Sequence, residues 1–310
     1  MFSINEQKQE PYIEFVAAWS AADLEPYSGC YALKLLSLHD HVANFQVAGW
    51  SHLLFIGDQD LAAGPASIGL ATEDFKDFRN HLLQSRSGRF EDGRAIFDLG
   101  KRRVTIDRRG GENKTFAPVF NFSEATTELV ITLEYYEKSL KDMDLPTPAA
   151  TLLASPGGDD YYRSAIAANF PAIIKALIDQ NKQELIKYCR SIYGMGHGLT
   201  PTGDDLIHAA FVVANIYSQK GRIFMDLLRP DVEAFSAQTG LFGRHMLEIG
   251  RRGLTPEPFG SYLEALKLGV REARIINNMI KIGSATGFDL AIGITVAVKK
   301  CFATDQFLDR

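Results

Sequence analysis

The chain has 310 residues, of which 46% are hydrophobic and 23% are charged, and its formal net charge is −5. This length allows one large domain or two ordinary ones, and the charged fraction is typical of a globular protein. The acidic balance argues against a nucleic-acid partner, because general nucleic-acid binders normally have a basic surface. No apolar run approaches the roughly 20 residues that cross a bilayer.

The N-terminal residues and the cysteines bear on location. The first thirty residues carry five acidic side chains, and they lack the basic start and the unbroken apolar core of a secretory signal. Cys30, Cys189 and Cys301 are far apart and match no metal-ligand spacing. We therefore expect reduced thiols in a cytoplasmic protein that has no membrane partner.

Short extended runs broken by turns dominate the chain up to about residue 135, and they predict a β-rich region. The clearest runs are Gly29–Leu38, Val42–Val47, His52–Ile56, Arg94–Leu99 and Arg103–Asp107. One helix is expected near Thr72–Gln84, with Thr72 as its N-cap. Its apolar stripe consists of Phe75, Phe78, Leu82 and Leu83.

Residues 144–158 read DLPTPAATLLASPGG, and their prolines and glycines predict a domain boundary. We therefore expect a β-rich domain with at least one helix over residues 1–150 and a helical domain over residues 151–310, an α+β fold. The expected helices are Asp159–Asp179, Lys182–Tyr193, Gly203–Gln219, about Asp231–Arg251, Glu257–Ile282, which a break could divide, and Gly287–Phe302.

The most distinctive segment is Gly194–Asp205, which reads GMGHGLTPTGDD and runs into a helix that is apolar on nearly every face. A buried helix start leaves four N–H groups without intrahelical partners. A glycine-rich approach lets the backbone come close to a ligand and point further N–H groups at it. The segment therefore predicts a site for an anion or a strongly polar group.

A second segment repeats this arrangement. Thr286–Leu290 matches Thr202–Leu206 position for position, and it also follows small residues and opens an apolar helix. Two such helix starts placed side by side would double the positive potential of the helix ends. The expected ligand-binding residues are Gly196, Gly198, Thr200, Thr202, Gly203, Ser284, Thr286 and Gly287, and the expected catalytic residues are His197, Asp204, Asp205 and Asp289.

Simpler interpretations stand beside this one. Thr-x-x-Asp resembles a capping box, in which the threonine caps the helix and the aspartate reaches back. His197 could be a general acid or base, or only a surface loop histidine. His208 shares a helix face with Asp204 and Asp205, which could hold a divalent metal such as Mg²⁺. A buried histidine bonded to a carboxylate is the commoner outcome, so no metal site and no certain cofactor is assigned.

At these residues the chain resembles the AllH-type family, whose members include a subunit of oxamate carbamoyltransferase from allantoin, and thus purine, breakdown. The resemblance rests on GLTPTGDD (residues 198–205), GSATGFD (residues 283–289) and the GPASI loop (residues 64–68). Ser284 stands where the family commonly has a histidine. The resemblance implies conversion of oxalurate and phosphate to oxamate and carbamoyl phosphate. It also implies a small anionic substrate and other carbamoyltransferase subunits as partners.

Three functions remain distinct at this point. The first is a carbamoyltransferase subunit acting on a small ureido acid, in which paired helix starts hold the anion and stabilise the oxyanion of acyl transfer. The second is a non-catalytic assembly subunit that binds a metabolite or nucleotide. The third is a metal-dependent hydrolase or phosphotransferase that uses Asp204, Asp205, His208 and Asp289.

Overall fold

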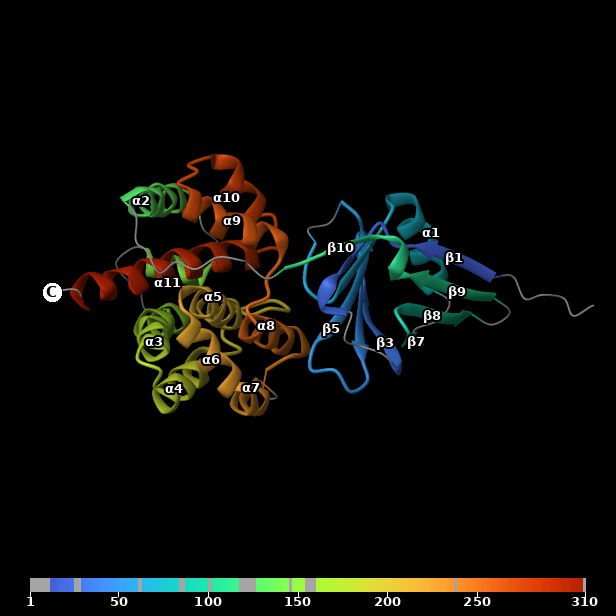
Figure 1. Cartoon of the computed structure of the whole chain (residues 1–310), viewed down its shortest axis with the longest axis horizontal. Helices are drawn as coiled ribbons and strands as arrows, with labels where there is room; N and C mark the ends of the chain where they lie inside the picture. The colour runs from blue at the N-terminus through green and yellow to red at the C-terminus, as the bar shows by residue number, and fades with distance from the viewer. Residues whose placement is uncertain are drawn as a thin grey trace, which may run out of the picture. The chain divides into compact units, whose positions relative to one another are not determined.

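The computed structural model describes residues 12–24, 29–60, 63–83, 87–99, 102–116, 127–144, 147–153, 160–236 and 239–308. Two compact units divide between Thr115 and Phe116. A single mixed sheet dominates the first unit and helices make up the second, which confirms the predicted α+β class (Figure 1). The domain boundary expected near residue 150 stays a prediction, and its residues 145–146 and 154–159 lie outside the described part.

The sheet has ten strands in the order β1-β9-β8-β7-β3-β4-β5-β6-β2-β10. The strands are β1 (Tyr12–Val16), β2 (Trp19–Ala21), β3 (Cys30–Leu38), β4 (Val42–Val47), β5 (Leu53–Asp58), β6 (Ser67–Leu70), β7 (Ser87–Glu91), β8 (Arg94–Leu99), β9 (Arg102–Asp107) and β10 (Glu112–Lys114). Two short 3₁₀ helices, Ala22–Leu24 and Arg108–Gly110, follow β2 and β9.

The chain itself joins the two ends of this strand order. Ala17, directly after β1, donates its N–H to Asp107 of β9, and Ala18 donates to Gly69 of β6. Neighbouring residues therefore bond to strands at opposite ends of the order. The sheet must therefore curve, so that strands near its two ends lie on either side of residues 17 and 18.

The five strands predicted from the sequence are confirmed, with shifts of one or two residues at their ends. The short strands β1, β2, β7 and β10 were not predicted, because three to five residues carry too little periodicity to read. The last two residues of the GPASI loop, Ser67 and Ile68, belong to β6. Three of the missed strands, β1, β2 and β10, lie at or near the ends of the strand order, so local patterns reveal the longer strands but not the edges of the sheet.

Helix α1 (Thr72–Leu82) covers part of the sheet, and two details of its prediction are corrected. Ala71 is the N-cap residue, while the Thr72 hydroxyl donates to Asp58 at 2.9 Å. Leu83 is 71% exposed and lies outside the apolar stripe. Phe78 of the stripe packs against Phe97 of β8 with ring centroids 5.3 Å apart.

The second unit contains helices α2 to α11. They are α2 (Thr127–Lys141), α3 (Tyr161–Ile178), α4 (Lys182–Ile192), α5 (Thr202–Tyr217), α6 (Gln219–Leu227), α7 (Arg229–Ser236), α8 (Leu241–Arg251), α9 (Glu257–Leu268), α10 (Ala273–Met279) and α11 (Thr286–Leu308), with a short 3₁₀ helix η3 (Pro148–Leu152). The predicted helix over 231–251 is two helices that part before Gly240, and Gly269 ends α9 in the left-handed conformation. Helices α2 and α6 were not predicted.

Helix α5 lies at the centre of this unit, with α3, α6, α8 and α11 packed around it (Figure 1). Every residue from Thr202 to Ala214 is buried, which explains why its sequence is apolar on all faces. Gly293 of α11 allows the two helices to approach closely, because a Cβ there would lie 2.7 Å from the Cβ of Ala209. No helix in the described ranges is both long and apolar enough to cross a membrane.

The packing of α11 on α5 makes a testable prediction. Gly293→Ala should lower the free energy of unfolding by about 1–3 kcal/mol, because the added methyl forces the helices apart. Gly260→Ala in α9 is the matched control, since its Cβ would meet nothing within 4 Å. That variant should gain about 0.5–1 kcal/mol from higher helix propensity. Urea unfolding of both variants measures the difference, and equal midpoints would contradict the packing described.

Candidate functional site

The starts of α5 and α11 lie side by side. The hydroxyl of Thr200, just before α5, is 2.7 Å from the hydroxyl of Thr286, the first residue of α11. The two motifs with the Thr-Gly-x-Asp pattern therefore meet in space, as their repetition in the sequence predicted.

Each helix start packs against the end of the helix that precedes it. A Cβ at Gly203 would lie 1.7 Å from the carbonyl oxygen of Ile192, the last residue of α4. A Cβ at Gly287 would lie 2.1 Å from the carbonyl oxygen of Met279, the last residue of α10. Glycine is thus required at the second position of both motifs for the same steric reason.

The loop that leads into α5 turns through left-handed backbone. Gly194, Gly196 and Gly198 have φ angles of 68°, 118° and 96°. At Gly196 the backbone is also crowded, because a Cβ would lie 2.7 Å from the amide nitrogen of Thr202. These glycines shape the loop, which accounts for the alternating pattern seen in the sequence.

The capping-box interpretation is wrong for α5. Pro201 is the N-cap residue and makes no side-chain cap, and Thr202 is the buried first residue of the helix. The threonines face the other motif instead. Thr202 lies beside Asp289 of α11 and Thr286 lies beside Asp205 of α5, and in each case the hydroxyl favours the charged carboxylate. The two helix starts are therefore joined by a crossed pair of threonine–aspartate contacts.

The side chain of Asp204 connects the glycine loop to the segment before α8. One carboxylate oxygen accepts the N–H of Gly194 at 2.8 Å, and the other accepts the hydroxyl of Thr239 at 2.7 Å. Gly243 of α8 leaves room for this arrangement, because a Cβ there would lie 2.0 Å from the carboxylate. Burial raises the pKa of Asp204, and both hydrogen bonds oppose that rise. The second acid of the motif thus fixes the loop to the segment that precedes α8.

Asp205 and Asp289 are buried together. Asp205 is fully inaccessible and Asp289 is 1% exposed. Burial raises the pKa of Asp205 well above its usual value, and the nearby charges of Asp289 and Asp204 raise it further. Burial also raises the pKa of Asp289 to about 6, although Thr147 of the segment before η3 donates a hydrogen bond to it. Two like charges so placed are unfavourable, which favours the retention of a proton by the pair.

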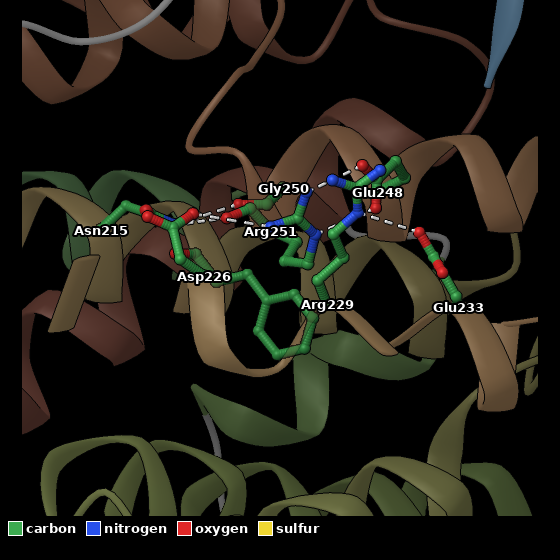
Figure 2. Close-up of polar contacts among 8 residues, drawn as sticks. Asn215, Asp226, Arg229, Glu233, Glu248, Gly250 and Arg251 are labelled. Atoms are coloured by element: carbon green, nitrogen blue, oxygen red, sulfur yellow. Dashed lines mark hydrogen bonds and ion pairs between the residues drawn. The ribbon is translucent and has the colours of Figure 1, made fainter. Parts of the chain in front are cut away.

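Helix α8 is tied to α5 at both ends. Thr239 binds Asp204 at one end, and at the other the side-chain amide of Asn215 donates to the carbonyl oxygens of Gly250 and Arg251 at 3.2 and 3.1 Å. Figure 2 shows Arg251 beside Glu248, with which it forms a buried, two-contact ion pair at 3.0 and 2.9 Å. The bonds of Thr239 and Asn215 hold α8 against α5, while the Arg251–Glu248 ion pair lies within α8.

Two predicted site residues lie apart from the buried carboxyls. His197 is exposed, and its ring meets the edge of Tyr162 of α3 with centroids 5.9 Å apart. Ser284 is exposed in the loop before α11. Both lie in the loops that lead to the helix starts, on the solvent side.

The metal interpretation that involved His208 is not supported by the geometry. One ring nitrogen of His208 is 2.8 Å from the carbonyl oxygen of Met246, and the other is 3.4 Å from the hydroxyl of Thr255. Burial lowers the pKa of this histidine to about 4. Its partners are a carbonyl and a hydroxyl, so the predicted hydrogen bond between this histidine and a carboxylate is wrong. Within the described ranges, no three histidine, cysteine or acidic side chains are grouped to hold a metal.

Sequence reasoning missed two threonines that contact the aspartates. Thr147 lies in the proline-rich segment that was interpreted only as a boundary, and Thr239 had no assigned role in the site. Neither belongs to a motif or a periodic pattern. Only the packing of distant segments brings them to the site.

The bracing role of Asp204 is testable through stability. Asp204→Ala leaves the N–H of Gly194 and the Thr239 hydroxyl without their acceptor, so the free energy of unfolding should fall by about 1–3 kcal/mol. Thermal and urea denaturation measure this loss. Asp142→Asn on the exposed end of α2 is the control and should change stability little. An unchanged midpoint for Asp204→Ala would show that the loop is held by other contacts.

The raised pKa of Asp289 predicts how stability depends on pH. The folded protein binds this proton more tightly than the unfolded chain, so stability falls as pH rises from about 4 to about 6 and then levels off. The change attributable to Asp289 is on the order of 3 kcal/mol. Asp289→Asn should flatten this part of the profile and be the more stable protein at neutral pH. Denaturant midpoints of both proteins, measured across this pH range, test the prediction. Parallel pH profiles for the parent protein and Asp289→Asn would refute the raised pKa of Asp289.

Comparison with known proteins gives one family match. The family model named oxamate carbamoyltransferase subunit AllH matches residues 192–298. The matched stretch runs from the end of α4 into α11, so it contains both helix starts and their aspartates. No curated protein and no solved structure matched the chain.

The match confirms the resemblance that was predicted from the two motifs, while the GPASI loop lies outside it. Residues 192–298, which build the paired helix starts, carry the sequence pattern of the AllH family.

Proposed function

We propose that this chain is a subunit of a carbamoyltransferase that acts on a small ureido acid, converting oxalurate and phosphate to oxamate and carbamoyl phosphate. The name of the matching family supports the carbamoyltransferase part of this proposal. The observation that locates the proposed reaction in the chain is the burial of Asp205 and Asp289 where two helix starts meet. Other subunits encoded for the same reaction are the proposed protein partners.

The helix starts suit the anionic part of such substrates. Helices α5 and α11 both begin here, and the positive end of a helix dipole attracts phosphate or carboxylate. The backbone N–H groups of residues 196–200 donate to no carbonyl oxygen in the described part of the chain. Consecutive N–H groups in a loop with left-handed residues form a concave anion site. We assign phosphate binding to this loop, including Gly196, Gly198 and Thr200.

Acidic side chains beside a phosphate raise an apparent conflict, which the burial of Asp205 resolves. Its raised pKa favours the protonated carboxyl, which repels no anion. Asp204 is turned toward Gly194 and Thr239, where it braces the loop. We therefore reserve proton transfer for Asp205 and Asp289, give Asp204 a positioning role, and place His197 and Ser284 at the solvent side of the substrate.

The remaining motif residues have structural reasons to be present that also serve the site. Gly203 and Gly287 let the helix starts reach their positions, and Thr202 and Thr286 lie beside the opposite aspartates. Paired helix starts of this kind would stabilise the tetrahedral oxyanion that forms when phosphate attacks a carbamoyl carbon. This chemistry requires no metal ligand from the protein, and Mg²⁺ could still accompany the phosphate as a substrate ion.

The proposal is tested by measuring phosphate-dependent release of carbamoyl phosphate from oxalurate by this chain together with its partner subunits. Asp205→Asn removes the proposed acid with little change of shape, so the rate should fall by roughly 10²-fold or more. Asp142→Asn, at an exposed position directly after α2, is the matched control and should keep the rate. If both Asp205→Asn and Asp289→Asn turn over at the normal rate, this site is not where the reaction occurs.

A further inference from the structure

The buried aspartate pair contains three oxygen atoms that lack hydrogen-bond partners. They are both carboxyl oxygens of Asp205 and one of Asp289. Thr200 and Thr286 lie beside Asp205, but their hydroxyls bond to each other and reach neither oxygen with good geometry. Buried polar atoms nearly always have partners, and leaving them without one is unfavourable. Three such atoms at one point indicate a missing group.

The groups that face the pair show what that missing group must supply. They are Thr202 and Asp204 from α5, Thr200 from the glycine loop, Thr286 from α11 and Thr147 from the segment before η3. None of them is a cation, and none forms a metal-ligand cluster with the pair among the described residues. The hydroxyls of Thr200 and Thr286 contact each other and that of Thr147 donates to the other oxygen of Asp289, so the three oxygens without partners have room for further donors, which a ligand with N–H groups can bring.

The pair also has a donor of its own to offer. Two carboxyl groups buried together do not both ionise, so one oxygen carries a hydrogen. That leaves one O–H donor and two acceptor oxygens among the three atoms without partners. A carbamoyl group, –C(=O)–NH₂, is the complement: one carbonyl oxygen accepts a hydrogen bond, and two N–H bonds donate.

We propose that Asp205 and Asp289 together form the receptor for the carbamoyl end of the substrate. The protonated carboxyl of Asp205 donates to the carbonyl oxygen and accepts one N–H, as a carboxylic acid pairs with an amide. The second N–H binds the free oxygen of Asp289. This inference rests on the proposed function. It adds the direction in which the substrate lies, with its carbamoyl end at the buried aspartate pair and its anionic end at the glycine loop.

The contact between Thr200 and Thr286 stands between this receptor and the solvent side. Both threonines are half-buried, whereas Asp205 beneath them is inaccessible. The ligand must therefore part the two hydroxyls as it binds. The hydroxyls can turn to Asp205 or to the ligand once their mutual contact opens, so no polar group is left without a partner.

The receptor makes a prediction about specificity. Acetyl phosphate has the shape and charge of carbamoyl phosphate, but a methyl group replaces its NH₂. Binding it would leave the acceptor oxygens of Asp205 and Asp289 without donors. Sites built to bind N–H or O–H groups reject analogues that lack them by factors up to about 10⁴–10⁵. We expect carbamoyl phosphate to bind at least about 100-fold more tightly than acetyl phosphate.

Calorimetry at neutral pH with the full chain in its assembly measures this preference, using carbamoyl phosphate, acetyl phosphate and inorganic phosphate as probes. Asp205→Asn and Asp289→Asn should abolish the preference and leave phosphate binding in place. Asp142→Asn should keep it. Thermal melts accompany each variant, and both asparagine variants should be at least as stable as the parent protein because a buried carboxyl is removed.

Equal affinity for the carbamoyl and acetyl compounds would overturn the receptor, and so would a preference that survives both asparagine variants or an absence of any binding. The outcomes separate this inference from the proposed function. Turnover of oxalurate without the preference would leave the carbamoyltransferase proposal standing and remove the receptor. A preference without turnover, even with the partner subunits present, would support the receptor in a binding subunit.

Discussion

The helical unit depends on one electrostatic constraint, the burial of two carboxyl groups where α5 and α11 begin. Charged carboxylates are costly to bury, and two of them close together are more so. The fold meets this cost with a crossed arrangement, in which the threonine of each motif lies beside the aspartate of the other. A retained proton and the hydrogen bond from Thr147 lower the cost of burial further. The helix starts are therefore held together by groups that could also serve a ligand.

The surrounding architecture keeps this meeting point rigid. Gly203 and Gly287 press each helix start onto the carbonyl end of the preceding helix, while Gly293 lets α11 lie close against α5. Helix α8 is fastened to α5 at both ends, through Asp204 and Asn215. Small residues and buried polar contacts thus fix the positions of the aspartates from several directions, as a preorganised site requires. The glycine loop above them is the exposed part of the arrangement.

The family match and the geometry of the helix starts concern the same residues. The matched residues 192–298 contain the crossed motifs but none of the sheet unit. A carbamoyl substrate has an amide end and an anionic partner in phosphate. The helix starts offer buried carboxyl oxygens for the first and backbone N–H groups for the second. This two-sided chemistry is the reason that we propose a carbamoyl transfer rather than simple phosphate binding.

The sequence by itself determined the α+β class, the longer strands and helices, and the repeated Thr-Gly-x-Asp pattern, because periodicity and short motifs are local properties. Tertiary structure decided what those motif residues do. Thr202 looked like a cap, yet it lies beside Asp289 of the other helix. Asp204 was predicted to be catalytic, and the structure adds its contacts with Gly194 and Thr239. Thr147 gave no signal at all. The partner of a buried side chain is set by segments far away in the chain. A local sequence pattern does not show which of these distant segments pack together.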